Sequence, residues 1–444
     1  MKEKILELIR LNNLKELKLF VNKAVDVELA EVFDDMPIPE LAKTFRLLSK
    51  DNALDVFAEL EPTVASDLLE YLSDKEAVGI LNELSADDAT DILEEMPANL
   101  VDKLLKKCNE TTRKDVNKLL NFKEDSAGSI MTVEYAEFKE DCKVRDAIEI
   151  LRTGFEDYET INTCFVLDKK RKLVGYVNIT DLLFAKKNDF LEEICNKDII
   201  SVYTSTDQEE VATIFQKYDI TVLPVVDSED RLVGIVTIDD VMDVVEEEAT
   251  EDMKKMAAII PIDKPYDKVG VLETVKARIP WLLLLMISAT FTGKIISSFE
   301  DSLATMPLLT AFIPMLMDTG GNAGGQASVS IIRALSLKDI EFKDIFKVMW
   351  KEFRVALLCA IVLSICNFVK LLIIDRVSVF VAGVVCLTLI ATVIIAKIIG
   401  CTLPMVAKRV GFDPAVMASP FITTIVDACS LLIYFAIASS FLGL

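Results

Sequence analysis

The chain has no histidine among its 444 residues. Without imidazole it cannot build a His-ligated zinc site, a Ser-His-Asp triad or the HExxH motif of metalloproteases. Its nine cysteines include no CxxC pair, which is typical of reduced, isolated thiols rather than of disulfides or a zinc site. The remaining metal ligands are the oxygens of Asp, Glu and Asn, which suit hard cations such as Mg2+, Ca2+ or Mn2+.

Charge is unevenly distributed along the chain. Residues 1–280 carry 36 Lys and Arg against 61 Asp and Glu, a net charge of −25, whereas residues 281–444 carry 12 against 10, a net charge of +2. The acidity of the first region argues against nucleic acid and for cations as partners. The first residues, MKEKILELIRLNN, lack the apolar core of a signal peptide, so we expect the acidic region to stay in the cytoplasm.

Residues 1–122 have the pattern of a row of short helices. Segments such as VASDLLEYLSD and KEAVGILNELSAD have apolar residues at helical spacing and end at Ser, Asp or Pro. This predicts an acidic α-helical repeat domain whose helices stack on a shared apolar stripe. Asp87, Asp88 and Asp91 follow Ser85 at one helix start, where helix capping and the helix dipole are the simpler explanation for each residue taken singly.

Residues 123–246 contain an internal duplication. FVLDKKRKLVGYVNITDLL at 165–183 aligns without a gap to PVVDSEDRLVGIVTIDDVM at 224–242, and each copy predicts a strand, a charged turn, a second strand and a helix start. The pattern resembles a tandem pair of CBS domains, which implies an α/β fold that commonly senses adenine nucleotides. The Thr-x-x-Asp that often holds the ribose in that family is present as Thr237 and Asp240, whereas the first copy has Asn178 with Asp181. Two alternatives remain open: the pair binds ATP, or it has a purely structural role.

An acidic segment, DDVMDVVEEEATEDMKKM, follows the duplication. Val241, Met242, Val244 and Val245 give it an apolar face, so we predict a rigid connecting helix at 247–277 rather than a solvated linker. Such a helix would transmit a movement of the soluble part to the region that follows.

Residues 278–444 are predicted to form an all-α transmembrane domain with five helices. A hydrocarbon core of about 30 Å needs roughly 20 residues, and spans of that length or more fall at 279–298, 303–332, 355–374, 377–406 and 414–442. Basic residues precede the first span and lie in the loops after the second and fourth, which places the N-terminus in the cytoplasm and the C-terminus outside. The sequence therefore predicts a multi-pass protein of the plasma (inner) membrane.

The second span contains a glycine-rich polar patch, DTGGNAGGQ, at 318–326. Its glycines have GxxxG spacing, and one interpretation is a face that packs against other helices. Asp318, Asn322 and Gln326 recur every four residues and share a helix face, which favours a polar path through the membrane. No strand precedes the patch and no GK[ST] follows it, which argues against a phosphate-binding loop. We predict that Asp318, Asn322 and Gly325 line the path.

Asp427 lies within the fifth span, about 13 residues or roughly 20 Å of helix from its start. A carboxylate at the centre of a span costs about 2.5–3.5 kcal/mol to insert, so it is expected to be neutral, paired or functional. We predict a pore cation site at Asp427, with a structural hydrogen bond as the alternative. Lys294 and Lys370 are expected to reach the membrane surface, and no role is assigned to Lys397.

The order of these parts resembles the MgtE family of magnesium channels along essentially the whole chain. The most specific pieces are EEEATEDM at 246–253, PMLMDTGGNAGGQAS at 314–328 and DPAVMASPFITTIVDACSLLIY at 413–434. The resemblance implies a homodimer in the lipid bilayer, a pore on its two-fold axis with a carboxylate at Asp427, and regulatory Mg2+ sites between cytosolic domains. Carried over by position, the regulatory ligands would be Asp87, Asp88, Asp91, Glu209, Asp219, Asp240, Glu251, Asp252 and Asp413.

The resemblance, together with the acidic domains, implies a Mg2+-selective channel or transporter that closes when cytosolic Mg2+ binds to those domains. The alternative is a divalent-cation carrier coupled to Na+ or H+. No residue pattern in the sequence distinguishes this carrier from the channel. Because catalytic motifs are missing, we do not expect an enzyme. The expected fold is multidomain: an α-helical repeat domain at 1–122, a tandem α/β CBS pair at 123–246, the connecting helix at 247–277 and the transmembrane domain at 278–444.

Overall fold

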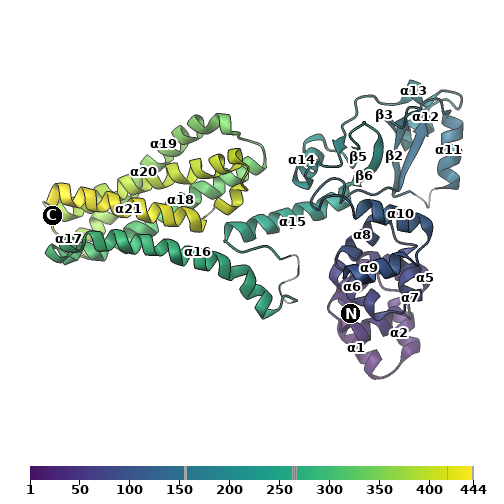
Figure 1. Cartoon of the computed structure of the whole chain (residues 1–444), viewed down its shortest axis with the longest axis horizontal. Helices are drawn as coiled ribbons and strands as arrows, with labels where there is room; N and C mark the ends of the chain where they lie inside the picture. The colour runs from purple at the N-terminus through teal and green to yellow at the C-terminus, as the bar shows by residue number, and fades with distance from the viewer. Residues whose placement is uncertain (155–157, 263, 265, 267, 418, 443–444) are drawn as a thin grey trace. The chain divides into compact units, whose positions relative to one another are not determined.

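The computed structural model describes residues 1–154, 158–262, 264, 266, 268–417 and 419–442. It divides into two compact units, Met1–Val245 and Glu246–Leu444 (Figure 1). The first unit begins with short helices and continues into two small sheets, whereas the second consists of long helices.

The N-terminal helices are short because a capping residue or a proline marks the start of most of them. Ser49, Ser73, Ser85 and Asn109 each accept a backbone N–H of the first turn, and Pro62 occupies the first position of its helix. The apolar faces of these helices meet in one core, which confirms the expected helical domain. The helices are α1 (Lys2–Arg10), α2 (Leu14–Val21), α3 (Asp26–Asp34), α4 (Ile38–Phe45), α5 (Lys50–Ala58), α6 (Pro62–Tyr71), α7 (Asp74–Leu81), α8 (Ala86–Glu94), α9 (Ala98–Leu105) and α10 (Glu110–Leu119).

The duplicated region forms two three-stranded sheets of the same topology. The strands are β1 (Tyr135–Lys139), β2 (Thr160–Leu167) and β3 (Leu173–Asn178) in the first sheet, and β4 (Val202–Tyr203), β5 (Val222–Val226) and β6 (Leu232–Thr237) in the second. In each sheet the first strand pairs parallel, and the third antiparallel, with the middle strand. The accompanying helices are α11 (Val144–Thr153), α12 (Ile179–Phe184), α13 (Leu191–Ile194), α14 (Gln208–Tyr218) and α15 (Ile238–Met256). The order of strand, turn, strand and helix that the repeat predicted is confirmed in both copies.

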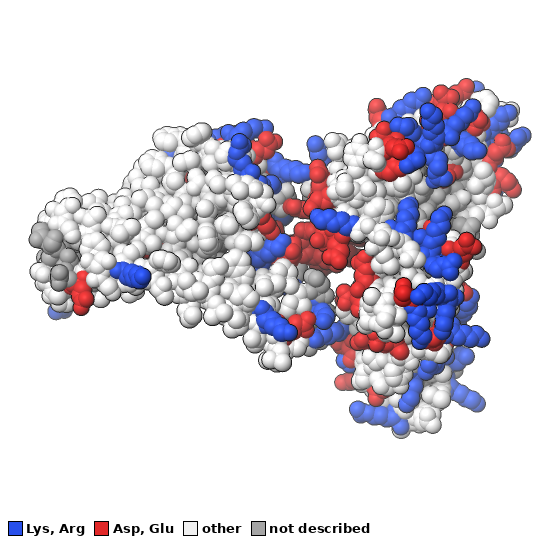
Figure 2. All heavy atoms as spheres, viewed as in Figure 1, with Lys and Arg blue, Asp and Glu red and all other residues white. Residues whose placement is uncertain are grey.

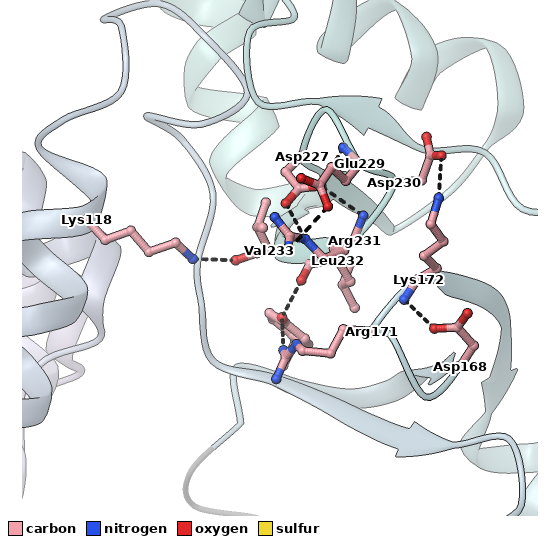
Figure 3. A network of polar contacts seen from close by, with 11 residues as sticks. Lys118, Asp168, Arg171, Lys172, Asp227, Glu229, Asp230, Arg231, Leu232 and Val233 are labelled. Carbon is pink, nitrogen blue, oxygen red and sulfur yellow. Dashed lines mark hydrogen bonds and ion pairs between the residues drawn. The ribbon is translucent and has the colours of Figure 1, made fainter.

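The two hairpin turns of the duplication have matching conformations and contact each other (Figure 3). Asp168 and Asp227 occupy equivalent positions, and the Oδ1 atom of each accepts two backbone N–H groups of its own turn. Arg171 and Asp230, also equivalent, have φ angles of 65° and 63°. Lys172 Nζ lies 3.1 Å from Asp230 Oδ2, which joins the two copies directly.

The connecting helix is shorter than predicted, which corrects the single helix expected at 247–277. α15 ends at Met256, and the next helix, α16 (Val271–Ser298), begins only at Val271. Ala258 has a φ of 55°, which cannot continue a right-handed helix, and Pro261 follows it. Positions 263, 265 and 267 of this segment, and position 418 of the fifth predicted span, lie outside the described residues.

The second unit is a bundle of long helices. After α16 come α17 (Glu300–Thr305), a 3-10 helix (Pro307–Phe312), α18 (Ile313–Ser336), a short 3-10 turn (Phe342–Asp344), α19 (Ile345–Ile373), α20 (Val379–Val410), another 3-10 turn (Pro414–Met417) and α21 (Ser419–Leu442). α18, α20 and α21 share an apolar core that includes Leu316, Val393, Val426 and Tyr434. Figure 2 shows little charge along the length of this bundle, and its Lys and Arg side chains gather mainly at one end.

By length and composition, four stretches of the described chain can cross a membrane: Val271–Ser298, Phe342–Ile373, Val379–Val410 and Pro414–Phe441. The span predicted at 303–332 needs correction, because Pro307 and Pro314 accompany a break into α17, a 3-10 helix and α18. α18 has one polar face and is not among the four. That α18 also crosses the membrane stays a prediction.

A buried ion pair joins α19 to α20. Lys397 Nζ and Glu352 Oε2 are 3.9 Å apart, and the two side chains are only 7% and 12% exposed. The sequence-based span began at Val355 and therefore missed Glu352 as a charge inside the bundle. Opposite charges within apolar helices compensate each other, whereas either one alone would be costly to bury.

Candidate cation sites

The glycines of α18 form a packing surface. A Cβ atom added to Gly320, Gly321 or Gly324 would lie 2.8, 2.8 or 2.9 Å from a side-chain carbon of α20 or α21. One added to Gly400 of α20 would clash with the carbonyl oxygen of Gly324. Real Cβ atoms are not tolerated at such distances, so these glycines allow the close approach of the helices. Gly325 is buried as well, and its predicted place on a polar path is untested.

The polar residues of the same patch lie on the side of α18 opposite Gly320 and Gly324. Asp318, Asn322 and Gln326 are exposed in the single chain, as are Ser330 and Arg333 further along the helix. We call these five residues the polar stripe. The two interpretations of the sequence patch therefore apply to different faces of one helix, with glycines packed inside and polar groups outside. A polar stripe on a membrane helix needs water or another polar surface against it.

Asp427 lies within α21. Its Oδ1 atom is buried and has no hydrogen-bond partner among the described residues. Thr423, one turn earlier, packs against Gly321, so this side of α21 faces α18. The alternative of a structural hydrogen bond finds no support in the described contacts of this atom, and the carboxylate is available to a cation.

A second group of carboxylates gathers where the N-terminal helices meet the duplicated region. Ala86 N at the start of α8 donates to Glu134 Oε1 at 3.2 Å, which links α8 to the segment before β1. The Thr237 hydroxyl donates to Asp240 Oδ2 at 2.5 Å at the start of α15. The residues of this acidic cluster act electrostatically on one another, and they are Asp87, Asp88, Asp91, Glu134, Glu159, Asp239 and Asp240.

Burial, followed by the charges of neighbouring carboxylates, raises the pKa values in the acidic cluster. The pKa of Asp88 is raised to about 6, and those of Glu134 and Asp240 to about 7. Burial also raises the pKa of Asp87, whose Oδ1 atom has no hydrogen-bond partner in the part of the chain that the structure describes. Asp91 lies at the exposed edge of the cluster, and its pKa is raised in the same direction. A bound cation would relieve this repulsion.

The acidic cluster is not a closed metal site. Within the described ranges, no three Asp, Glu or Cys side chains converge closely enough to hold a bare metal ion. Mg2+ usually keeps several of its waters and binds proteins through one or two carboxylates, so it does not need such a cage. The arrangement suits a hydrated cation that bridges the two sides of the cluster.

Glu251 and Asp413, both predicted metal ligands, are joined by an ammonium group. Lys255 Nζ lies 2.7 Å from Glu251 and 2.8 Å from Asp413. Burial lowers the pKa of Lys255, but hydrogen bonds to the two carboxylates outweigh it and raise the pKa above its usual range. The ammonium group of Lys255 thus lies between Glu251 and Asp413, where a bridging metal cation would otherwise bind. Asp252 follows Glu251 on α15.

The remaining predicted regulatory ligands do not meet one another in the single chain. Glu209 is in the first turn of α14, whereas Asp219 ends this helix with a φ of 51°. Ten residues of helix separate them by about 15 Å, so they cannot share one ion within one chain. Their assignment as ligands stays a prediction.

The predicted nucleotide-binding residues are engaged in helix capping. Asp181 is exposed, and its Oδ2 atom accepts the Asn178 N–H at 3.1 Å. Thr237 is buried, and its hydroxyl is bonded to Asp240. A nucleotide that binds the Thr-x-x-Asp would have to replace this internal hydrogen bond.

Sequence reasoning missed Glu134, Glu159 and Asp239 of the acidic cluster, and it missed Lys255. Asp239 was adjacent to a predicted ligand and was recognisable from the acidic pair that starts α15. Glu134 and Glu159 flank strands in the first copy and carry no pattern of their own. Only the packing of α8 against this copy identifies them as part of a site.

Comparison with known proteins places these features in a family. The family model described as "Divalent cation transporter", MgtE, matches residues 313–437, the MgtE intracellular N domain matches 26–125, and CBS domains match 127–188 and 191–247. The magnesium transporter MgtE of Bacillus subtilis is 33% identical over 443 residues, which cover 99% of this chain and 97% of that protein. The magnesium transporter MgtE of Thermus thermophilus is 39% identical over 331 residues, or 74% of this chain and 72% of that one.

A solved structure is similar to the soluble part. The cytosolic domain of the Mg2+ channel MgtE in complex with ATP matches with a TM-score of 0.52 and 35% identity, and the match covers 55% of this chain and all of that one. Since the named relatives are transporters, the expectation that the chain is not an enzyme is confirmed. With helical N domain, CBS pair and apolar helices in the order of its relatives, the chain belongs to the MgtE family of magnesium transporters.

Proposed function

We propose that this transporter is a Mg2+-selective channel of the plasma membrane that works as a homodimer and closes when cytosolic Mg2+ is plentiful. The observation that carries the proposal is the exposed polar stripe of α18 beside Asp427, which has an unpartnered carboxylate oxygen within the described residues. The N-terminus lies in the cytoplasm and the C-terminus outside, in agreement with the basic residues between α18 and α19 and at the end of α20.

The polar stripe is the reason for a dimer. In a single chain it would face lipid, where a charged residue near the centre of a helix costs about 2.5–3.5 kcal/mol. Two chains related by a two-fold axis could place their stripes and their Asp427 carboxylates around one aqueous path. Two opposed carboxylates would hold Mg2+ through its retained waters, since Mg2+ is reluctant to dehydrate.

Regulation is assigned to the acidic cluster. Without cations, the like charges of α8, the first CBS copy and the start of α15 repel one another, and Mg2+ would bring these elements together. A switch from 1:99 to 99:1 between two states takes only about 5.5 kcal/mol of differential binding, which a few bridged carboxylates can supply. α15 begins in this cluster and ends at Met256, next to Lys255 and its contact with Asp413, so it is the element through which Mg2+ would act.

ATP is proposed as a ligand of the CBS pair, because a related cytosolic domain was solved in complex with ATP. Calorimetry on the purified chain should then show ATP binding that weakens at least about tenfold in Thr237→Ala, since the Thr-x-x-Asp loses its hydroxyl. Asn178→Ala, at the equivalent position of the first copy, is the matched control. If the parent and Thr237→Ala bind ATP with equal affinity, Thr237 is not part of the ATP-binding site.

Ion flux through proteoliposomes tests the main proposal. Vesicles that contain the purified chain and a Mg2+ indicator should take up Mg2+ in preference to Ca2+, driven by the Mg2+ gradient alone. Uptake that requires an imposed Na+ or H+ gradient would favour the coupled carrier instead. Absence of Mg2+ uptake under all of these gradients would contradict both transport mechanisms.

A further inference from the structure

Two carboxylates of different helices lie at the same depth in the helical bundle. Gly324 faces Ile422, and Gly320, one turn earlier, faces Val426 and Ser430, so α18 and α21 run antiparallel. Gly321 faces Thr423 in the same register. Asp318 precedes Gly321 by three residues and Asp427 follows Thr423 by four, which brings the two acids level, since each residue adds about 1.5 Å along a helix.

The side chains of Asp318 and Asp427 differ in their surroundings. Asp318 is exposed on the polar stripe, and no ion pair of its carboxylate is found within the described part of the chain. Asp427 is half-buried, with one oxygen fully enclosed and unbonded to any described residue. Two like charges at one level of an apolar bundle are unfavourable unless something positive stands near them.

A role in stability does not explain this pair. The buried pair of Glu352 and Lys397 shows how this bundle compensates a structural charge, with an opposite charge 3.9 Å away. Asp318 has no such partner among the described residues, although Asn322 and Gln326 continue its polar face along α18. Its carboxylate therefore has no structural ion pair within the described residues, and a membrane helix that exposes it needs water or another polar surface against it.

We propose that Asp318 supplies a second carboxylate to the ion-binding step at Asp427 and thereby sets the affinity and the preference for divalent over monovalent cations. The proposal rests on the proposed function, in which Asp427 lies on the ion path. A hydrated Mg2+ donates hydrogen bonds from its waters, and each subunit would offer it two carboxylates instead of one. Coulomb energy scales with the charge of the ion, so an added carboxylate favours Mg2+ over Na+ or K+.

Flux measurements with Asp318→Asn test the proposal. The Mg2+ concentration for half-maximal uptake should rise about tenfold, while the maximal rate changes less than about threefold, and discrimination against Na+ should fall by a similar factor. Asp318→Glu keeps the charge and should stay near the parent. Asp339→Asn, an exposed acid just after α18, is the control for a general loss of charge.

The outcomes separate this proposal from the proposed function. Normal affinity and selectivity in Asp318→Asn, together with lost uptake in Asp427→Asn, would overturn the role of Asp318 alone. Normal uptake in both variants would contradict the pore itself. Should Asp318→Asn fail to fold, Asp318→Cys offers an independent measurement: Cd2+, which favours thiolates, should block its uptake at concentrations at least about tenfold below those needed for the parent. Equal Cd2+ sensitivity would place position 318 away from the ion path.

Discussion

Replacing Asp427 by asparagine should lower Mg2+ uptake at limiting Mg2+ by at least about a hundredfold. The substitution removes one negative charge from each subunit at nearly constant shape. Two unit charges 4 Å apart interact by about 4 kcal/mol at an effective dielectric constant of 20, and a divalent ion interacts more strongly. Even when retained waters reduce this energy to about 3 kcal/mol, the loss corresponds to roughly two powers of ten in affinity. Initial uptake rates in proteoliposomes over a range of Mg2+ concentrations measure the effect.

The control for this prediction makes the same chemical change outside the helical bundle. Asp339→Asn removes an exposed carboxylate just beyond α18 and should leave uptake within about twofold of the parent. Size-exclusion chromatography in detergent checks that both variants keep the oligomeric state of the parent. If the Asp427→Asn variant has the oligomeric state of the parent and takes up Mg2+ at the rate of the parent, Asp427 does not lie on the ion path.

The free energy of unfolding of the cytosolic region should fall as the pH rises from about 5 to about 8 in Mg2+-free buffer. The carboxyl groups of Asp88, Glu134 and Asp240 have pKa values of about 6 to 7 in the folded chain. Unfolded Asp and Glu have pKa values near 4, so in this window the folded state binds more protons, and stability must decrease with pH. Below about pH 4 these groups are protonated in both states, and above about pH 8 they are ionised in both, so the loss is then complete.

The expected size of this effect is moderate, because the cluster has an open edge. Each unit of pKa shift corresponds to about 1.4 kcal/mol, but screening by solvent reduces the sum, and we expect a loss of at least about 3 kcal/mol between pH 5 and pH 8. For a region of this size, that lowers the Tm by about 6–12 °C. Asp74 and Glu76 do not disturb the measurement, because hydrogen bonds from Lys103 and Arg46 lower their pKa values to about 2.

Millimolar Mg2+ at pH 8 should restore the lost stability, whereas KCl at equal ionic strength should not, since K+ screens charge without bridging carboxylates. Thermal unfolding of residues 1–256, followed by circular dichroism, measures both effects. In the triple variant Asp88→Asn, Glu134→Gln, Asp240→Asn, the dependence on pH should become smaller, since only the raised pKa values of Asp87, Asp91 and Glu159 then contribute. The gain in stability from Mg2+ should largely vanish, and flux through the full chain should no longer respond to Mg2+ on the cytosolic side.

A matched control removes the same number of charges from the exposed surface of the N-terminal helices. Glu3, Glu28 and Asp55 are exposed there, and their amide variant should respond to pH and Mg2+ as the parent does. If the triple cluster variant and the parent gain equal stability from Mg2+, the cation binds elsewhere and the assignment of the acidic cluster is wrong.

Local structure was largely predictable from the sequence. The duplication at 165–183 and 224–242 led to the correct pairs of strands, because alternating apolar residues and a charged turn describe a hairpin through neighbours along the chain. The helices of residues 1–122 were predictable for the same reason, since caps such as Ser73 and Ser85 act within one turn. Helix ends were predicted less accurately, and the predictions missed the break at Ala258 and the break at Pro307 before α18.

The helical period alone predicts which polar residues of α18 share a face, because it places Asp318, Asn322 and Gln326 together. It places Gly320 and Gly324 opposite them. The burial of the glycines and the equal depth of Asp318 and Asp427 could not be predicted in this way, because both depend on how α18 packs against α20 and α21. The acidic cluster was likewise decided by packing, since its members come from α8, the first CBS copy and α15. The helical period relates residues only within a few turns of one helix. The charge at a site depends on all the segments that folding brings together, and these segments are far apart in the sequence.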